Sequence, residues 1–285
     1  FNIDHDKIEE KITKRTKAIL PVQLFGLPVE MDPVLEIAQK HNLLVVEDAA
    51  CGFGSRYKEN HVGTLGNAGC FSFHPRKSIT TGEGGMITTN DHLLAEKLQI
   101  LRDHGAYMSD LQRHLGNRPY LLSDHPEAGY NQRMTDIQGA LGSSQMDRAS
   151  QILLERKRLA ERYDEAFKDL KWLRIPWREK SFEHAYQSYP CLFGINPHAP
   201  NSVAIANKFR NQWMDNLFKE GISTRPATHA VHMLTYYSKK YRLKPLDFPN
   251  AFAADQLSIS FPLFNGMRDE EQNHVIDKIL QLNPF

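Results

Sequence analysis

Residues 18–48 read AILPVQLFGLPVEMDPVLEIAQKHNLLVVED, and this stretch decides the fold. The apolar run at 18–25 predicts a buried strand, and Asp32-Pro33 predicts the first residues of a helix. A second continuous apolar run, at 43–46, predicts another strand. Strand, helix and strand in close succession form a βαβ unit, and uninterrupted apolar runs are typical of parallel strands that are covered on both faces. The sequence therefore predicts an α/β fold.

The rest of the chain continues this pattern and then changes it. Up to about residue 147 strands and helices alternate, which extends the sheet, whereas the later part has the mixed pattern of an α+β domain. We therefore expect one domain over 1–147 and a second over 148–285. The expected elements are strands at 70–73, 85–89, 185–194 and 257–261 and helices at 91–101, 135–170 (one long helix or a broken pair), 202–219 and 269–282.

Composition excludes several classes of protein. The 285 residues carry 35 Lys+Arg and 34 Asp+Glu, a net charge of +1, so no large positive field exists to attract nucleic acid. No apolar run approaches the ~18 residues that a membrane-spanning helix needs. The three cysteines form no CxxC pair, which makes a disulfide framework improbable and favours a reducing, cytoplasmic location. We expect no metal site, because the spacing of Cys51, His61, Cys70 and His74 fits no standard zinc pattern.

Three residues suggest a particular chemistry. Asp48 follows an apolar strand, at the sheet edge where α/β proteins bind ligands, although an isolated Asp there is also a common turn residue. Lys77 follows Ser72 by five residues and precedes a Gly-rich loop, although a single lysine is most often a solvated surface charge. Together they offer a carboxylate for a pyridinium nitrogen, a hydroxyl for a phosphate and an amine for an aldehyde. These are the groups that a pyridoxal phosphate (PLP) site needs.

Seven segments along nearly the whole chain carry further information. They are VVEDAA (45–50), FSFHPRK (71–77), TTGEGG (80–85), LRDHG (101–105), GYNQRMTDIQGALG (129–142), GISTRP (221–226) and LSISFPLF (257–264). In this order they resemble the DegT/DnrJ/StrS family of PLP-dependent sugar aminotransferases. The resemblance implies an aspartate-aminotransferase-like fold (fold type I), in which a large domain with a mostly parallel central sheet precedes a smaller C-terminal α+β domain.

The resemblance also implies roles for single residues. Lys77 would bond to the cofactor aldehyde and move the proton between the amino-acid α-carbon and the cofactor. Asp48 would pair with the pyridine nitrogen, and Ser72 would bind the phosphate. Asn131 matches a residue that family members extend to the partner subunit's phosphate, so we expect a homodimer with composite sites. Cys51 stands where the family commonly has Gln or His against the cofactor; either that contact is lost or a small residue is tolerated there.

The function implied is transfer of an amino group from an amino acid, with L-glutamate as the expected donor, to a nucleotide-linked keto sugar for polysaccharide or antibiotic sugar synthesis. One alternative is a sugar dehydratase of the same fold, but such relatives have His where this chain has Lys77. The other alternative is a non-catalytic regulatory or structural member of the family.

Four other features of the sequence are less specific. Residues 63–69 resemble a glycine-rich phosphate loop but lack the strand–loop–helix context, which favours a turn. Tyr236-Tyr237 with His229 and His232 could line a sugar pocket or pack between domains. The basic residues at 156–162 alternate with Glu, as on a solvated helix face. Finally, residues 1–19 match a segment that relatives reach only after further chain, so we expect that an N-terminal segment is missing.

Overall fold

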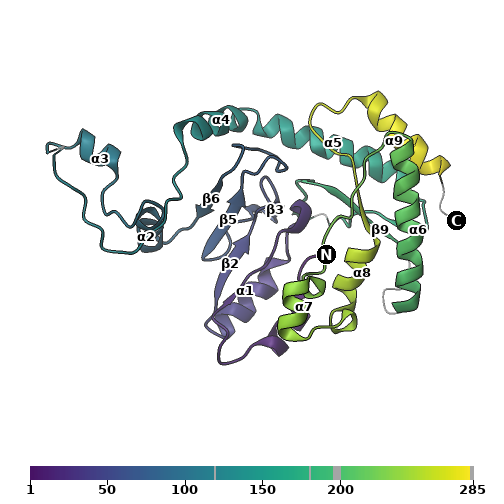
Figure 1. Cartoon of the computed structure of the whole chain (residues 1–285), viewed down its shortest axis with the longest axis horizontal. Coiled ribbons are helices and arrows are strands. Elements are labelled where there is room, and N and C mark those ends of the chain that lie inside the picture. Colours follow the sequence, from purple (N-terminus) through teal and green to yellow (C-terminus); the bar gives the residue numbers. More distant parts are fainter. Residues whose placement is uncertain (119, 180, 195–199, 283–285) are drawn as a thin grey trace. The chain divides into compact units, whose positions relative to one another are not determined.

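The computed structural model describes residues 1–118, 120–179, 181–194 and 200–282 (Figure 1). The chain divides into two compact units. The N-terminal unit consists of Ile3–Gln23 and Pro28–Ala149, and the C-terminal unit consists of Phe1–Asn2, Leu24–Leu27 and Ser150–Phe285. Among the described residues, no helix combines the length and the apolar character that a bilayer crossing requires.

A four-stranded sheet with the order β1-β2-β5-β6 lies in the N-terminal unit. Strands β1, β2 and β5 are parallel, and β6 is antiparallel to β5. This mostly parallel sheet, in which α1 connects the parallel strands β1 and β2, confirms the α/β class. The strands are β1 (Ala18–Ile19), β2 (Leu44–Asp48), β5 (Ala68–Ser72) and β6 (Gly85–Thr88).

The expected strand at 18–25 is much shorter in the structure. Beyond β1 the pairing continues only as an isolated parallel bridge between Val22 and Asp48. Pro21 has no N–H to donate to a ladder, and the chain then turns through a short 3-10 helix, η3 (Leu24–Gly26), in which Phe25 has a φ of 60°. The apolar run predicted burial correctly at Ile19 and Phe25 but not regular pairing.

Helices of the N-terminal unit begin near the expected residues. Helix α1 starts at Met31 and not at the expected cap: Asp32 lies in the first turn, where it forms an ion pair with Lys58. Helix α2 begins one residue after the expected start at residue 91, and Asp91 caps it through its side chain. The other elements of the unit are η1 (His5–Lys7), η2 (Glu9–Lys11), α1 (Met31–Lys40), the antiparallel pair β3 (Arg56–Tyr57) and β4 (Asn60–His61), α2 (His92–Arg102), α3 (Asp110–Leu115) and α4 (Asp136–Met146).

The C-terminal unit has the expected α+β pattern. Its sheet, with the order β10-β9-β7, is antiparallel. The helical region at 135–170 is a broken pair, because α4 ends before Asp147 and α5 begins at Ala149. The elements are α5 (Ala149–Phe167), β7 (Leu173–Arg174), β8 (Phe182–Glu183), β9 (Tyr189–Phe193), α6 (Pro200–Lys219), η4 (Val231–Met233), α7 (Thr235–Tyr241), η5 (Pro245–Asp247), α8 (Pro249–Leu257), β10 (Ser258–Phe261) and α9 (Asp269–Gln281).

Aromatic rings from α5, α6, β9 and β10 fill the core of this unit. The ring of Tyr163 lies 5.0 Å from that of Tyr189 and 5.5 Å from that of Phe167, centroid to centroid. Trp213 meets Phe261 edge-on at 6.0 Å. Buried aromatic pairs of this kind contribute about 0.5–1.5 kcal/mol each beyond the area that they bury.

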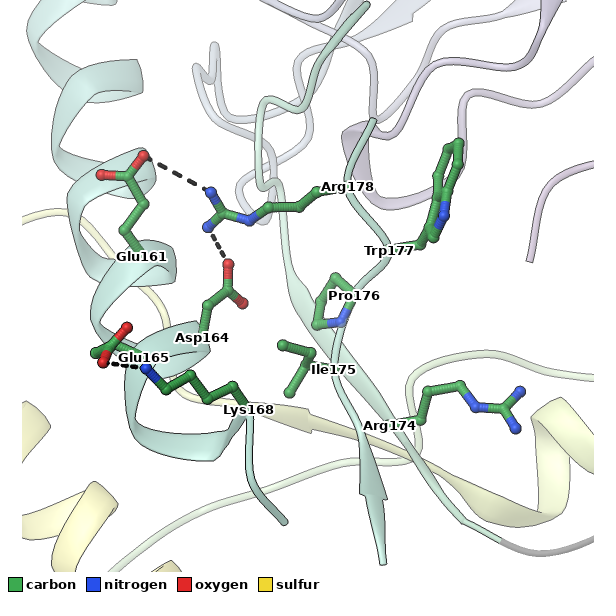
Figure 2. Close-up of a pocket in the computed structure, with 9 residues that line it drawn as sticks. All are labelled: Glu161, Asp164, Glu165, Lys168, Arg174, Ile175, Pro176, Trp177 and Arg178. Atoms are coloured by element: carbon green, nitrogen blue, oxygen red, sulfur yellow. Dashed lines mark hydrogen bonds and ion pairs between the residues drawn. The ribbon is translucent and has the colours of Figure 1, made fainter. Parts of the chain in front are cut away.

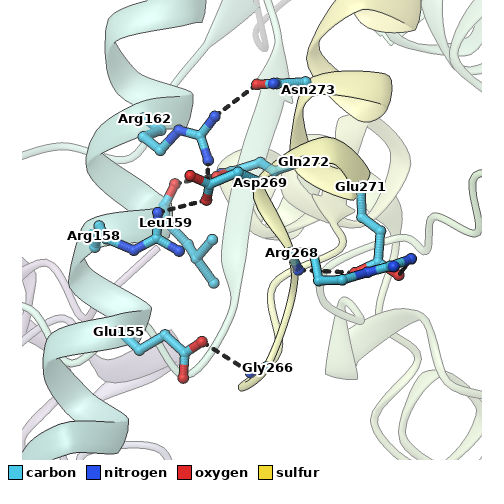
Figure 3. Close-up of polar contacts among 10 residues, drawn as sticks. All are labelled: Glu155, Arg158, Leu159, Arg162, Gly266, Arg268, Asp269, Glu271, Gln272 and Asn273. Atoms are coloured by element: carbon cyan, nitrogen blue, oxygen red, sulfur yellow. Dashed lines mark hydrogen bonds and ion pairs between the residues drawn. The ribbon is translucent and has the colours of Figure 1, made fainter.

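Polar contacts join α5 to α9 in the same unit (Figure 3). The guanidinium groups of Arg158 and Arg162 both donate to Asp269 Oδ1 at 2.7 Å, and Arg158 holds the pKa of that carboxyl below its usual range. The buried Gln272 side chain donates to the Leu159 carbonyl at 2.7 Å. The prediction that the basic residues at 156–162 lie on a solvated helix face is partly wrong. Arg156 is buried, and its guanidinium donates to the backbone carbonyls of Tyr186 and Gln187, which precede β9.

The segment 24–27 joins the C-terminal unit through backbone hydrogen bonds. Ala185 N donates to Gly26 O at 3.0 Å, and Gln187 N donates to Phe25 O at 2.9 Å. The predicted boundary between residues 147 and 148 does not account for this, because it assigns residues 24–27 to the first domain. Whether residues 1–147 serve as the cofactor-binding domain and 148–285 as a separate small domain stays a prediction.

Candidate active site

A buried carboxylate, Glu47, organises the sheet edge. Its Oε2 accepts hydrogen bonds from Gly63 N at 2.7 Å and from the Gln23 side chain at 2.9 Å. Its Oε1 accepts from Leu65 N at 2.7 Å and from Gly66 N at 2.8 Å. Glu47 and Gln23 are both inaccessible to solvent. Four donors around one buried carboxylate satisfy its charge, so the strand and the loop at 63–66 form one rigid piece.

This arrangement shows whether the glycine-rich segment at 63–69 is a phosphate loop or a turn. The loop does present a row of backbone N–H groups, as a phosphate loop does, but Glu47 of the same chain occupies them. The glycines are needed for close approach: Gly63 has a φ of +83°, and a Cβ on Gly69 would lie 2.1 Å from Gly63 O. The segment is therefore a turn, and the carboxylate of Glu47 accepts the hydrogen bonds of its backbone N–H groups.

Asp48, the last residue of β2, lies at the carboxyl end of the parallel strands. Its backbone N–H donates to Pro21 O and its carbonyl accepts from Gln23 N, both at 2.9 Å. Its Oδ1 accepts from Ala50 N at 3.1 Å, which tightens the turn that follows. Asp48 pairs in register with Cys70 of β5, and burial together with the Asp48 charge raises the pKa of the Cys70 thiol. The carboxylate therefore lies at the ligand-binding edge of the sheet.

Lys77 lies in a loop, residues 73–84, whose base is closed by backbone hydrogen bonds. Phe73 N donates to Gly84 O at 2.9 Å, and Phe73 O accepts from Thr81 N at 3.0 Å. Within the loop, Lys77 N donates to His74 O at 2.9 Å. The half-buried Lys77 side chain reaches the turn after β2, where Nζ donates to Cys51 Sγ at 3.1 Å. The structure thus brings together two of the five residues that the sequence singled out.

Ser72 and Asn131 have different surroundings. Ser72 ends β5, one strand from Asp48, and its hydroxyl accepts from His74 N at 3.3 Å. Asn131 is exposed and forms an isolated antiparallel bridge with Asp103. Over the described part of the chain, no hydrogen bond joins the Asn131 side chain to Asp48, Ser72 or Lys77. An Asn that acts on a partner subunit would show no such bond within its own chain.

These donors fit PLP chemically. Within the N-terminal unit, a carboxylate and a hydroxyl end the neighbouring parallel strands β2 and β5, and a half-buried amine reaches the residue three positions after that carboxylate. Among the described residues the amine has one weak partner, Cys51 Sγ, so it is available to an aldehyde. No cluster of three or more His, Cys, Asp or Glu side chains in the described ranges could hold a metal ion.

A different hollow lies in the C-terminal unit, between α5 and residues 174–178 (Figure 2). Arg178 forms ion pairs there with Glu161, at 3.7 Å, and with Asp164. The five residues that the sequence singled out do not line this hollow. Lys168 also pairs with Glu165, and these ion pairs between lining residues indicate a structural cluster.

The fold, the site chemistry and comparisons with known proteins define the class of this protein. Among solved structures, the putative sugar aminotransferase Spr1654 from Streptococcus pneumoniae in its PMP form matches with a TM-score of 0.88 and 26% identity, over 99% of this chain and 73% of that one. The same protein has a PLP form. Helicobacter pylori PseC, an aminotransferase involved in the biosynthesis of pseudoaminic acid, matches with a TM-score of 0.86 and 29% identity, over 99% and 70%. The protein is an aminotransferase of PLP fold type I.

The family is also clear. The model of the DegT/DnrJ/EryC1/StrS aminotransferase family matches residues 1–280, and the chain belongs to that family. The GDP-perosamine synthase of Caulobacter vibrioides is 36% identical over 283 residues, which cover 99% of this chain and 70% of the relative. The family, the fold class and the PLP requirement inferred from the sequence are confirmed; the roles of Asp48, Cys51, Ser72, Lys77 and Asn131 stay predictions.

Sequence reasoning missed Glu47 as an organising residue. A signal was present, because a Glu inside an otherwise apolar strand must find partners, and a glycine-rich loop with free N–H groups follows it. Gln23 gave no such signal, since its role depends on the return of residues 21–23 to the end of β2.

Replacing Glu47 by Gln should lower the free energy of unfolding by about 2–4 kcal/mol, because an amide nitrogen cannot accept the N–H bonds that one carboxylate oxygen now accepts. Urea unfolding monitored by circular dichroism measures this change. Glu59→Gln, at an exposed position in the β3–β4 turn, is the matched control and should change stability by less than about 0.5 kcal/mol. Equal effects of the two substitutions would show that the Glu47 network is not stabilising.

The C-terminal unit should lose stability in acid because of His184. Its ring stacks on Tyr186 at 4.0 Å, and burial, with a smaller contribution from the Arg178 charge, lowers the pKa of His184 to about 3. The unfolded chain therefore binds a proton below about pH 6.5 while the folded chain does not, so stability falls as the pH drops from 6.5 toward 3.

Between pH 7 and pH 4.5 the wild type should lose about 1–2 kcal/mol more than His184→Asn, allowing for solvent screening. Urea titrations at the two pH values give the difference. His92→Asn, at an exposed position, should follow the wild type; a His184→Asn protein as acid-sensitive as the wild type would contradict the assignment.

Proposed function

We propose that this aminotransferase moves an amino group from an amino acid, with L-glutamate as the donor, to the keto carbon of a nucleotide-linked sugar. The observation that carries the proposal is the Lys77 amine. It is half-buried, and a weak hydrogen bond holds it to Cys51, the residue three positions after Asp48. The product would enter polysaccharide or antibiotic sugar synthesis.

In this proposal each residue has one task. When bound, PLP supplies an aldehyde and an electron-withdrawing ring that stabilises negative charge at the amino-acid α-carbon. Asp48 keeps the ring nitrogen protonated, Ser72 binds the phosphate, and Lys77 holds and moves the proton at the α-carbon. The buried Glu47 network supports this work indirectly, because it fixes the strand that carries Asp48.

The substrate class rests on the relatives. One is named a GDP-perosamine synthase, and PseC is described as acting in the biosynthesis of pseudoaminic acid. Both names describe amino sugars, and the first names a nucleotide. These names support a nucleotide-linked keto sugar as the substrate of this chain, and they leave the sugar and the aminated carbon open.

We further propose a cytoplasmic homodimer in which Asn131 of one subunit completes the site of the other. Asn131 is exposed, and the side chains of Tyr130 and Ile137 near it are 64% and 83% exposed. Large apolar side chains exposed in this way are typical of surfaces that another protein covers. The three free cysteines support a reducing compartment.

Lys77→Ala should abolish transamination, with a fall of at least about 1,000-fold, because both the bond to the cofactor and the proton transfer are lost. The assay incubates the protein with PLP, glutamate and a panel of nucleotide keto sugars, and follows 2-oxoglutarate and the amino sugar by mass spectrometry. Lys14→Ala, an exposed lysine of the same unit, should retain full activity. Turnover by Lys77→Ala at the wild-type rate, or no turnover of any sugar by the wild type, would refute the proposal.

The composite site predicts complementation between two inactive variants. A mixture of Lys77→Ala and Asn131→Ala subunits should regain about a quarter of wild-type activity, because half of the dimers are mixed and each mixed dimer has one intact site. Each variant alone should stay inactive. Activity of the mixture no greater than that of the separate variants would place Asn131 outside the partner's site.

A further inference from the structure

We infer that Cys51 is a positioning residue for Lys77: its thiol accepts a hydrogen bond from the lysine amine and fixes where that amine lies before the cofactor binds. The inference rests on the proposed function, in which Lys77 bonds to the cofactor. It differs from the role that the family resemblance assigns to this position, which is a contact with the cofactor by Gln or His.

The turn that carries Cys51 is rigid. Asp48 Oδ1 accepts from Ala50 N at 3.1 Å, and Gly52 N donates to Ala49 O at 2.8 Å, so the turn is closed on both sides of Cys51. Gly52 is packed so closely that a Cβ there would lie 2.7 Å from Val62 Cγ2. These contacts restrain the Cys51 backbone, and its short side chain has one rotatable bond that places the sulfur.

The Lys77 side chain, by contrast, is long and needs an anchor. A lysine side chain loses up to about 2 kcal/mol of rotamer entropy when it is fixed. The hydrogen bond from Lys77 N to His74 O restrains the Lys77 backbone but leaves its four side-chain torsions free. Throughout the described ranges, Cys51 Sγ is the one hydrogen-bond partner of Lys77 Nζ, at 3.1 Å. Cys51 is thus the group that selects one position for the amine.

The choice of sulfur has a chemical consequence. An amine must be neutral to attack an aldehyde, and a carboxylate at this position would stabilise the ammonium form. A thiol is a weak hydrogen-bond acceptor, so it can orient the amine and still release it at little cost. A short side chain at position 51 also leaves room for Lys77 to occupy the place that a longer Gln or His would fill.

Direct contact between the two groups can be tested without the cofactor. o-Phthalaldehyde condenses with one amine and one thiol that lie within hydrogen-bond distance; the dialdehyde, the amine and the thiol give one fluorescent isoindole and two molecules of water. The cofactor-free protein should form one isoindole per chain, and mass spectrometry should locate it at Lys77 and Cys51. Cys51→Ser and Lys77→Arg should lose it, whereas Cys70→Ser and Cys191→Ser should keep it. No adduct, or an adduct at Cys70, would overturn the inference.

The positioning effect needs a second measurement. When PLP is added to cofactor-free protein, the absorbance change that reports its reaction with Lys77 should be about threefold or more slower in Cys51→Ala, because the amine is no longer held in place. Cys51→Ser, which restores an acceptor, should return the rate to within about twofold of the wild type. Cys70→Ala is the matched control and should react like the wild type.

The two proposals fail in different ways. A Cys51→Ala protein that reacts with PLP as fast as the wild type, or a Cys51→Ser protein as slow as Cys51→Ala, would overturn the positioning role and leave the aminotransferase proposal intact. A wild type that forms the isoindole and shows the expected order of rates, but aminates no sugar, would support the positioning role and refute the proposed substrate.

Discussion

The buried carboxylate of Glu47 is the interaction on which the candidate site depends. It accepts four hydrogen bonds, three from backbone N–H groups of residues 63–66 and one from Gln23, and all four donors come from outside its own strand. A buried charge with four donors in place is stable, but each missing donor would leave it partly unsatisfied at a high cost. Strand β2, the loop at 63–66 and the segment at 21–23 therefore depend on one another for their positions.

Two consecutive residues at the end of β2, Glu47 and Asp48, have different roles, one structural and one proposed to be chemical. Side chains alternate along a strand, so Glu47 and Asp48 point to opposite sides. Glu47 is fully buried and its two oxygens accept four hydrogen bonds, whereas Asp48 is only half-buried and its Oδ1 accepts from Ala50 N in the turn that follows. Two backbone hydrogen bonds hold Asp48 beside the segment at 21–23, and the side chain of Gln23 from that segment also donates to Glu47. A rigid support and a reactive group are thus built by two consecutive acidic residues.

The sequence predicted the parts of the fold that local patterns determine. The apolar runs located β2, β5 and β10, and Asp91 located the start of α2. What it could not predict depends on residues that meet from far apart: the shortening of the strand at Pro21, the burial of Arg156 against backbone carbonyls near β9, and the Glu47 network. For the site, motif order indicated the residues, but the Lys77–Cys51 contact joins two separate turns, and no spacing rule contains it.

The membership of residues 24–27 in the C-terminal unit has a consequence for synthesis. Ribosomes release the N-terminal part of a chain first, and early segments usually fold with their sequence neighbours. Here the carbonyls of Phe25 and Gly26 accept hydrogen bonds from Gln187 and Ala185, which are synthesised much later. Phe25 meanwhile has a backbone conformation that bulky residues rarely adopt and that these late contacts support. Residues 24–27 can therefore reach their final state only after residue 187 has been made, although they precede it by about 160 residues in the chain.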